Sequence, residues 1–264
     1  MNTDVDNSYT LITGASAGIG KQLAIEFAKR KSNLFLIALP KSGLESFSQQ
    51  LRDEFNIEVN FLCMNLVFNN SPKKVYSYAK EHNIQVNVLV NNAGVGFEGK
   101  FENLAPEKID QILLLNVRAT TMLTYYFLPH LKNAEKAHIL NISSFAGMTP
   151  IPYKSLYSAS KGFVWYFSQA LNEELKDTHI KVLSVFPSGV KTERTLDKIK
   201  KSSMLAKITT MYPTEVAEMA VSSLYKGKEI LIPGAFTKMY YVLGYILPQG
   251  LVLKLSSLIF RKYP

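Results

Sequence analysis

Tyr157 and Lys161 are the two side chains whose types and spacing best suit proton transfer in this sequence. They stand four positions apart, which places a phenol and an ammonium group one turn apart on one face of a helix. A nearby cation stabilises a phenolate and lowers the pKa of the phenol by about one to three units. Tyr76 and Lys80 have the same spacing, so the spacing alone does not identify a site.

Ser143 and Ser144 distinguish the two tyrosine–lysine pairs. They end an expected strand upstream of Tyr157, whereas no comparable serine precedes Tyr76. A serine hydroxyl beside a phenol can donate a hydrogen bond to an oxygen atom on which negative charge develops. The sequence therefore favours Tyr157, Lys161 and one of these serines as a group that moves a proton to or from an oxygen atom.

A glycine-rich turn joins the first expected strand to the first expected helix. It contains Gly14, Gly18 and Gly20, and it follows the apolar run Tyr9–Thr13. A strand that turns tightly into a helix needs residues without a Cβ, and the exposed helix N-terminus then offers N–H groups to a pyrophosphate. The glycines alone would fit an ordinary turn, but the order of strand, loop and helix favours a dinucleotide site.

Short apolar runs alternate with longer amphipathic stretches, a pattern typical of a parallel sheet covered by helices. We expect strands at Tyr9–Thr13, Asn33–Leu39, Glu58–Met64, Val86–Asn91, Ala137–Ile142, Lys181–Phe186 and Glu229–Ile232. We expect helices at Gly18–Lys31, Gly43–Phe55, Ser71–His82, Pro106–Leu131, Leu156–Thr178 and Thr214–Lys226. No repeat or low-complexity linker interrupts this order, so a single α/β domain is expected.

Two motifs besides the tyrosine–lysine pair make the chain resemble the short-chain dehydrogenase/reductase family. The glycines of the first turn have the spacing Gly-x-x-x-Gly-x-Gly, and Asn91-Asn92-Ala93-Gly94 closes the fourth strand. The resemblance extends from about Tyr9 to Ile232. It implies a Rossmann-type, doubly wound parallel sheet of about seven strands with helices on both faces, and a ligand at the carboxyl ends of the strands. Residues 1–235 would form one dinucleotide-binding catalytic domain.

The resemblance also implies a set of catalytic side chains. The family's serine stands thirteen positions before its tyrosine, which selects Ser144 over Ser143, and its asparagine corresponds to Asn116. The implied reaction is hydride transfer between a nicotinamide and a carbonyl or secondary alcohol, with Tyr157 as acid or base. Lys161 would favour the phenolate and reach the cofactor ribose. Ser144 would polarise the carbonyl, and Asn116 would hold a water that carries the proton onward.

The expected cofactor contacts lie mainly at the carboxyl ends of the strands. They are Gly14, Ser16, Gly18, Ile19, Gly20, Leu39, Lys41, Asn65, Leu66, Asn91, Ala93, Gly94, Tyr157, Lys161, Pro187, Val190 and Thr192. The second strand ends without the acidic residue that would favour NAD, and Lys41 follows it, so NADP is favoured and NAD stays open. Asn65 stands where the family has an aspartate facing the adenine, and Ser188 replaces a glycine.

The substrate is less accessible from the sequence. Stretches 146–153 and 188–211 border the site in the family, and their apolar side chains favour an apolar or acyl-type carbonyl substrate, unless they pack beneath the lid. These side chains are Met148, Pro150, Ile151, Pro152, Tyr153, Met204, Leu205 and Met211. Stretch 188–211 is basic and lies between a strand and a helix, so we expect a mobile substrate lid there.

Residues 236–264 form an apolar C-terminal extension that Pro248-Gln249-Gly250 interrupts. Neither half is long enough to span a bilayer. The extension could pack against the domain or a second subunit, cover the substrate pocket, or lie in a membrane interface with Arg261 and Lys262 at the lipid headgroups. Packing is the default expectation, and peripheral membrane contact is the main alternative.

Composition narrows the range of partners and compartments. The 264-residue chain has a formal net charge of +9, but its basic residues are spread out and no nucleic-acid motif is present, so nucleic acid is not expected. Its four histidines lack ligand spacing, so no metal site is expected. We expect Cys63 to be a core thiol. The lack of a cysteine pair and of signal-peptide features favours a cytoplasmic location, with membrane association as an alternative.

Two further expectations concern assembly and the alternative to an enzyme. The family frequently pairs through the helices expected near 106–131 and 156–178, so a homodimer or homotetramer is expected. The alternative function is a non-catalytic dinucleotide sensor or interaction protein on the same fold. The complete set of Asn116, Ser144, Tyr157 and Lys161 argues against it, because a sensor needs no proton donor.

Overall fold

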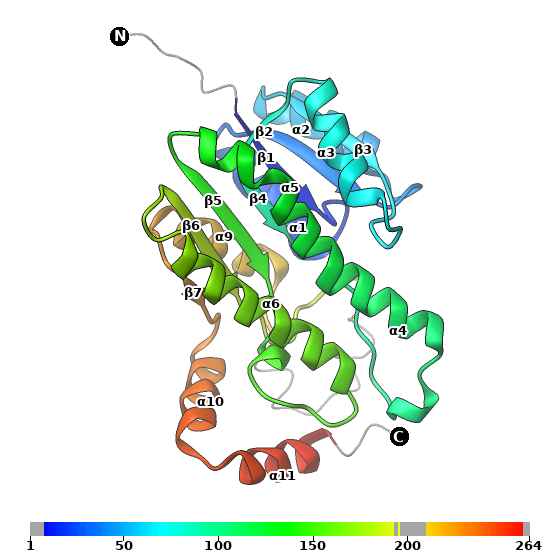
Figure 1. Cartoon of the computed structure of the whole chain (residues 1–264), viewed down its shortest axis with the longest axis vertical. Coiled ribbons are helices and arrows are strands. Elements are labelled where there is room, and N and C mark those ends of the chain that lie inside the picture. The colour runs from blue at the N-terminus through cyan, green and yellow to red at the C-terminus, as the bar shows by residue number, and fades with distance from the viewer. Residues whose placement is uncertain (1–7, 193–194, 196–209, 261–264) are drawn as a thin grey trace.

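The computed structural model describes residues 8–192, 195 and 210–260. Within these residues, seven parallel strands form one sheet in the order β3-β2-β1-β4-β5-β6-β7, as Figure 1 shows. The strands are β1 (Ser8–Thr13), β2 (Asn33–Ala38), β3 (Val59–Cys63), β4 (Gln85–Asn91), β5 (Ala137–Ile142), β6 (Ile180–Val185) and β7 (Ile230–Leu231). The order reverses direction at β1 and β4, which confirms the doubly wound sheet expected from the sequence.

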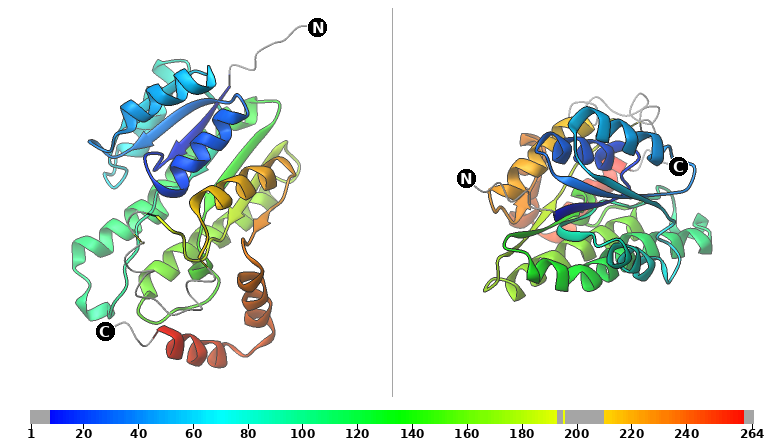
Figure 2. Two further views of the ribbon diagram at one scale, coloured as in Figure 1. Left: turned by 180° about the vertical axis from the view of Figure 1, so that it is seen from behind. Right: turned by 90° about the horizontal axis from the view of Figure 1, so that it is seen from above.

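Helices cover both faces of the sheet (Figure 2). One face carries α1 (Gly18–Lys29), α2 (Leu44–Phe55) and α9 (Pro213–Tyr225). The other face carries α3 (Ser71–Glu81), α5 (Thr120–Asn133) and α6 (Ser155–Glu174). Side chains alternate along a strand, so Ile12 of β1 packs into the first core and its neighbour Leu11 into the second. The strands read as continuous apolar runs because both of their faces are covered.

The helix expected at 106–131 is divided into three parts. α4 (Pro106–Ile112) is followed by a π-helical segment, Leu113–Ala119, and then by α5. Asn116 lies in the π-helical segment and is buried. Short π-helical turns occur frequently at functional sites, because they displace side chains from the regular helical register. Apolar periodicity does not reveal one such turn inside a longer helix, so the sequence predicts only one helix here.

The C-terminal extension forms two helices, α10 (Ala235–Ile246) and α11 (Gln249–Phe260), separated near Pro248 as expected. They lie at the end of the molecule opposite α2 and α3 (Figure 1). The Tyr241 ring lies 6.0 Å from the ring of Trp165 on α6, and Val252 and Ser256 are buried. Several apolar side chains nevertheless remain exposed: Met239, Val242, Ile246, Leu251 and Leu253. Among the described helices, none has both the length and the apolar character needed to cross a bilayer.

Some expectations differ from the structure or fall outside it. Cys63 is exposed, so the expectation of a core thiol is wrong; it ends β3, which lies at the edge of the sheet and has a neighbouring strand on one side only. β7 is shorter than expected. Most of the expected lid 188–211, including Met204 and Leu205, lies outside the described residues.

Candidate active site

The turn between β1 and α1 is built from glycines that a side chain would disrupt. Gly14 and Gly18 have φ angles of +67° and +56°, a region that L-residues with a Cβ avoid. A Cβ at Gly20 would lie 2.2 Å from the carbonyl oxygen of Gly14, so α1 starts directly on the loop. No side chain caps α1 at Ala17, and no acidic residue lies in its first turn. The N–H groups of this turn therefore suit a pyrophosphate.

Thr13 and Asn92 fasten this turn to the end of β4. The Thr13 hydroxyl oxygen accepts hydrogen bonds from the N–H groups of Asn92 and Ala93, at 3.0 and 3.1 Å. Asn92 Nδ2 donates to the carbonyl oxygens of Thr13 and Gly14, at 2.8 and 3.2 Å. Neither Thr13 nor Asn92 is among the side chains that the sequence predicts for the site. Their positions inside the two motifs are the signal that would have found them.

α6 presents Tyr157 and Lys161 beside the loop that follows β4. The Nζ atom of Lys161 donates a 2.7 Å hydrogen bond to the carbonyl oxygen of Ile142, the last residue of β5. A Cβ added at Gly94 would lie 3.2 Å from this Nζ, and a Cβ added at Gly96 would lie 3.4 Å from the Tyr157 ring. The absence of side chains at Gly94 and Gly96 lets the loop pass close to both groups.

The two serines that follow β5 have different partners. Ser143 is buried, and its hydroxyl donates a 2.8 Å hydrogen bond to the carbonyl oxygen of Lys161. The hydroxyl oxygen of Ser144 accepts from the N–H of Ala146 at 3.2 Å, and its side chain is also hydrogen-bonded to the hydroxyl of Tyr157. Ser143 thus holds α6 against the sheet, while Ser144 lies with Tyr157. The catalytic role of Ser144 stays a prediction.

Asn116 connects the π-helical segment to the loop after β4. Its Oδ1 accepts a 2.8 Å hydrogen bond from the N–H of Val95, and its Nδ2 donates to the Val95 carbonyl oxygen at 2.9 Å. Nδ2 also donates to Oγ of Ser160, on α6, at 3.0 Å. The amide of Asn116 therefore orders the backbone beside Gly94 and Gly96. The water-holding role that the resemblance implies for Asn116 stays a prediction.

Burial governs the ionisation of the two central groups. Desolvation raises the pKa of Tyr157; its hydrogen bond with Ser144 lowers the pKa, and the carboxylate of Glu98 raises it further. Burial also lowers the pKa of Lys161 to about 8. The sequence predicts that Lys161 lowers the pKa of Tyr157, and the structure shows a raised pKa instead. The reason is that a site withdrawn from water disfavours both the phenolate and the ammonium ion.

Two of the residues expected at the adenosine end of the cofactor lie exposed beyond β2. Leu39 is 49% exposed, and Lys41 is an exposed residue with a φ angle of +59°. Lys41 borders a hollow of about 530 Å³ between this turn, α2 and β3. Its lining also includes Ser42, Glu45, Arg52, Phe61 and Cys63. Lys41 and Arg52 are the cationic groups of this hollow that would attract an anion, and the carboxylate of Glu45 opposes them.

Three other expected contacts engage their side chains within the protein: that of Asn65 bonds the local backbone, and those of Leu66 and Asn91 are buried. Asn65 Oδ1 accepts a hydrogen bond from the N–H of Val67 at 3.1 Å, and Leu66 belongs to the core shared by α3 and α5. Asn91 Nδ2 donates to Asn141 Oδ1 at 2.8 Å. These side chains shape the strand ends from inside, and only the backbone of Leu66 and Asn91 remains for a cofactor contact.

The residues expected at the nicotinamide end lie next to the glycine turn. The carbonyl oxygen of Pro187 accepts a hydrogen bond from the N–H of Phe145 at 2.9 Å, and Val190 pairs with Met211. A Cβ added at Gly18 would lie 3.2 Å from Cγ2 of Thr192. The segment after β6 therefore runs between the loop that carries Ser144 and the start of α1.

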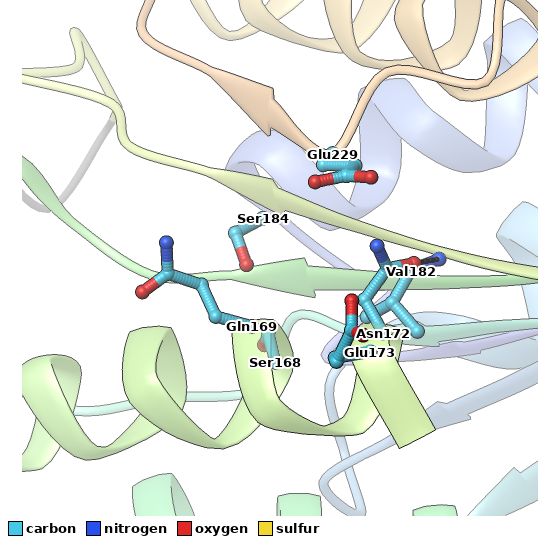
Figure 3. A pocket seen from close by; sticks show the side chains of 7 residues that line it. All are labelled: Ser168, Gln169, Asn172, Glu173, Val182, Ser184 and Glu229. Atoms are coloured by element: carbon cyan, nitrogen blue, oxygen red, sulfur yellow. Dashed lines mark hydrogen bonds between the residues drawn. The ribbon is translucent and has the colours of Figure 1, made fainter. Parts of the chain in front are cut away.

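A second hollow, of about 190 Å³, lies between the C-terminal half of α6, β6 and the residue before β7. Figure 3 shows Gln169, Asn172 and Glu173 on α6 facing the strand, and Glu229 on the opposite side. Asn172 Oδ1 accepts a 3.1 Å hydrogen bond from the N–H of Val182. This hollow contains none of the expected site residues. Among the described residues, no group of three or more histidine, cysteine or acidic side chains could hold a metal ion.

A family model described as "short chain dehydrogenase" matches residues 8–202. Over 200 residues the chain is 34% identical to a very-long-chain 3-oxoacyl-CoA reductase from Rattus norvegicus. The matched region covers 74% of this chain and 63% of that protein. The chain thus spans less than two thirds of the length of this relative.

Two solved structures extend the similarity to nearly the whole chain. A short-chain dehydrogenase from Sphingobium yanoikuyae in complex with NADPH has 30% identity and a TM-score of 0.78, covering 93% of this chain and 95% of that one. A bulky-bulky ketone specific alcohol dehydrogenase from Comamonas testosteroni has 28% identity and a TM-score of 0.77, covering 93% of each. The sheet order, the glycine turn and the family match agree, and the chain belongs to the short-chain dehydrogenase family.

Proposed function

We propose that this chain is an NADP-dependent oxidoreductase that interconverts a carbonyl group and a secondary alcohol, and that it works as a carbonyl reductase. The observation that carries the proposal is the arrangement of Ser144, Tyr157 and Lys161 beside Gly94, at the strand ends next to the glycine turn. Lys161 is only 5% exposed. Burying a cation is costly, so its position there is best explained by a chemical role.

The chain's own residues supply the proton chemistry of this reaction. NADPH, when bound, supplies the hydride to the carbonyl carbon. Ser144 donates a hydrogen bond to the carbonyl oxygen, on which negative charge develops, and Tyr157 transfers its hydroxyl proton to that oxygen, which completes the alcohol. Lys161 stabilises the phenolate that remains. In the oxidative direction the Tyr157 phenolate accepts the proton of the alcohol.

The preference for NADP rests on the end of β2. The stretch Ala38-Leu39-Pro40 places no carboxylate there that would repel a 2′-phosphate. Lys41 is exposed on the next turn, beside the hollow that Arg52 also lines. The Sphingobium yanoikuyae relative is in complex with NADPH, which supports the same preference.

The substrate we propose is an apolar or acyl-type ketone. Met148 and Tyr153 are partly exposed between Ser144 and Tyr157 in the chain, whereas Ile151 is buried and packs inside. The relatives named above act on 3-oxoacyl-CoA and on ketones with bulky groups. Both names describe a carbonyl next to a large group, and the partly exposed Met148 and Tyr153, close in the chain to Tyr157, support a substrate with a large apolar group.

We also propose a homodimer or homotetramer in the cytoplasm. Exposed aromatic side chains lie on the two helices expected to pair: Tyr125 on α5 is 68% exposed, and Phe163 and Tyr166 on α6 are 40% and 69% exposed. Large exposed aromatic side chains are typical of surfaces that become covered. The exposed apolar residues Met239, Val242 and Ile246 share one face of α10, and peripheral membrane contact would occur there.

The test measures binding and turnover separately. NADPH and NADH are titrated into the protein, and NADPH oxidation is followed with a panel of apolar ketones and 3-oxoacyl thioesters. We expect NADPH to bind more tightly than NADH and Tyr157→Phe to bind NADPH but to lose at least about 100-fold in turnover. Tyr76→Phe, in the other tyrosine–lysine pair of the same spacing, is the matched control and should retain full activity. Binding without turnover of any ketone would favour the sensor, and failure to bind either nucleotide would overturn the proposal.

A further inference from the structure

The approach to α6 is tied to the loop after β4 at three points close to Tyr157. We call residues 94–99 the β4 loop. The N–H of Gly99 donates a 2.8 Å hydrogen bond to the carbonyl oxygen of Tyr153, and Gly96 lies against the Tyr157 ring. Between these two contacts, Nζ of Lys154 lies 2.5 Å from Oε1 of Glu98.

Lys154 is well placed to transmit the position of the β4 loop to Tyr157. It is the N-terminal capping residue of α6, and its carbonyl oxygen accepts a 2.8 Å hydrogen bond from the N–H of Ser158. Tyr157 therefore lies in the first turn of a helix whose start is held by Lys154. Tyr153, just before it, has a φ angle of +66°, and such backbone strain in a bulky residue persists only where the surroundings impose it.

The ion pair is withdrawn from water to an extent unusual for a surface pair. The side chains of Lys154 and Glu98 are 20% and 27% exposed. By contrast, Lys176 and Glu173 form a pair of the same 2.5 Å length on the same helix, but their side chains are 60% and 73% exposed. Partial burial strengthens the attraction between opposite charges and reduces its screening by salt.

The charges around Tyr157 come from three parts of the described structure. Lys161 lies one turn further along α6, and Glu98 with Lys154 faces Tyr157 from the β4 loop and the start of the helix. Lys100 and Glu102 form an exposed pair beyond that loop. The carboxylate of Glu98 raises the pKa of Tyr157, and Lys154 is ion-paired with this carboxylate.

We propose that Glu98 and Lys154 are positioning residues that hold the β4 loop on the Tyr157 ring and set the net charge facing its hydroxyl. The proposal rests on the proposed function of Tyr157 as proton donor. It assigns a role to two charged residues that lie outside the predicted catalytic set of Asn116, Ser144, Tyr157 and Lys161. The pair acts on the reaction through Tyr157.

The first test measures the acidity of Tyr157 without any turnover. The full-length protein is labelled with carbon-13 at the Cζ atom of tyrosine, and the Tyr157 signal is assigned by its loss in Tyr157→Phe. We expect Glu98→Gln to lower the pKa of Tyr157 by about 0.5 to 1 unit, and Lys154→Met to raise it by a similar amount. Lys154→Arg should keep the wild-type value, and Lys176→Met, in the exposed pair, should not change it.

The second test measures coupling between the two residues in catalysis. If Glu98 and Lys154 act only as an ion pair, each single variant should lower kcat/KM about tenfold. The double variant Glu98→Gln/Lys154→Met should then lower kcat/KM no further than either single variant does. Unchanged Tyr157 acidity in both single variants, or losses that multiply in the double variant, would overturn the proposal. A protein that reduced no ketone would instead refute the proposed function, and the titration of Tyr157 would still decide the role of the pair.

Discussion

The hydroxyl of Ser143 donates a 2.8 Å hydrogen bond to the backbone carbonyl oxygen of Lys161. This bond joins the residue after β5 to the middle of the first half of α6. Ser144 is the next residue along the chain, and Tyr157 lies one turn before Lys161. The fold therefore sets the relative position of the proposed proton donor and the proposed carbonyl-polarising hydroxyl through a serine that does not itself face them.

The two serines should respond to substitution in opposite ways. Ser143→Ala removes the buried hydrogen bond that joins the end of β5 to the Lys161 carbonyl oxygen, which keeps its partner within the helix, and should lower the free energy of unfolding by about 1 kcal/mol. Ser144→Ala should leave that free energy nearly unchanged and lower kcat by about 100- to 1000-fold, as loss of an oxyanion donor does elsewhere. Urea denaturation and steady-state kinetics on both variants check this. If both variants lost activity equally and had equal free energies of unfolding, the structural role of Ser143 and the catalytic role of Ser144 would be contradicted.

Asn116 should act on cofactor binding through Val95. Asn116→Leu removes both hydrogen bonds to the Val95 backbone and the one to Ser160. We expect the free energy of unfolding to fall by about 2–4 kcal/mol and the affinity for NADPH to weaken, because the loop beside Gly94 loses its support. Calorimetric titration with NADPH, alongside thermal unfolding, measures both effects. A variant with unchanged NADPH affinity would show that this clamp does not support the cofactor site.

The glycine turn offers a matched pair of substitutions. Gly20→Ala would bring a methyl group within 2.2 Å of the Gly14 carbonyl oxygen, so the turn must open and NADPH binding should fall by at least about tenfold. Gly250, in α11, has open space where its Cβ would be, and Gly250→Ala should bind NADPH normally and be slightly more stable. The NADPH affinity and the urea denaturation of both variants are measured. Together they show whether a side chain is tolerated less well in the glycine turn than at a glycine elsewhere in a helix.

Burial of Lys161 should make stability depend on pH. Its pKa is about 8 in the folded protein against 10.5 ordinarily, so between these values the unfolded chain binds more protons and the free energy of unfolding rises with pH. The destabilisation is complete below pH 8 and amounts to about 3 kcal/mol by the size of this shift. The free energy of unfolding of Lys161→Met should not rise in this way. The amount by which it exceeds that of the wild type should therefore be largest near neutral pH, where the wild type is destabilised most.

Urea denaturation of both proteins from about pH 7 to about pH 9.5 tests this dependence. Lys176→Met serves as the control, because Lys176 is exposed on the same helix. Parallel pH profiles for Lys161→Met and the wild type would show that Lys161 is not destabilised by burial. Lys161→Met should also lose turnover, since the phenolate of Tyr157 then loses the cation one turn away on α6.

The sequence alone was sufficient to identify the sheet and the glycine turn, and it predicts Tyr157 rather than Tyr76 as the proton donor. These features depend on local patterns, namely apolar runs of strand length, glycines at a strand-to-helix turn, and motifs read in their order along the chain. The family and the fold follow from them because each motif lies next to the element that positions it.

Only the tertiary structure decided how the site is held together. Ser143, Asn92 and Glu98 acquire their roles from partners 18, 79 and 56 residues away, and the sequence does not identify these partners. The pKa of Tyr157 is raised, whereas the spacing of Tyr157 and Lys161 predicts a lowered pKa. Burial has a larger effect on this pKa than the nearby cation does. Hydrogen bonds and desolvation depend on what surrounds a group in space, and the order of residues does not specify those surroundings until the chain has folded.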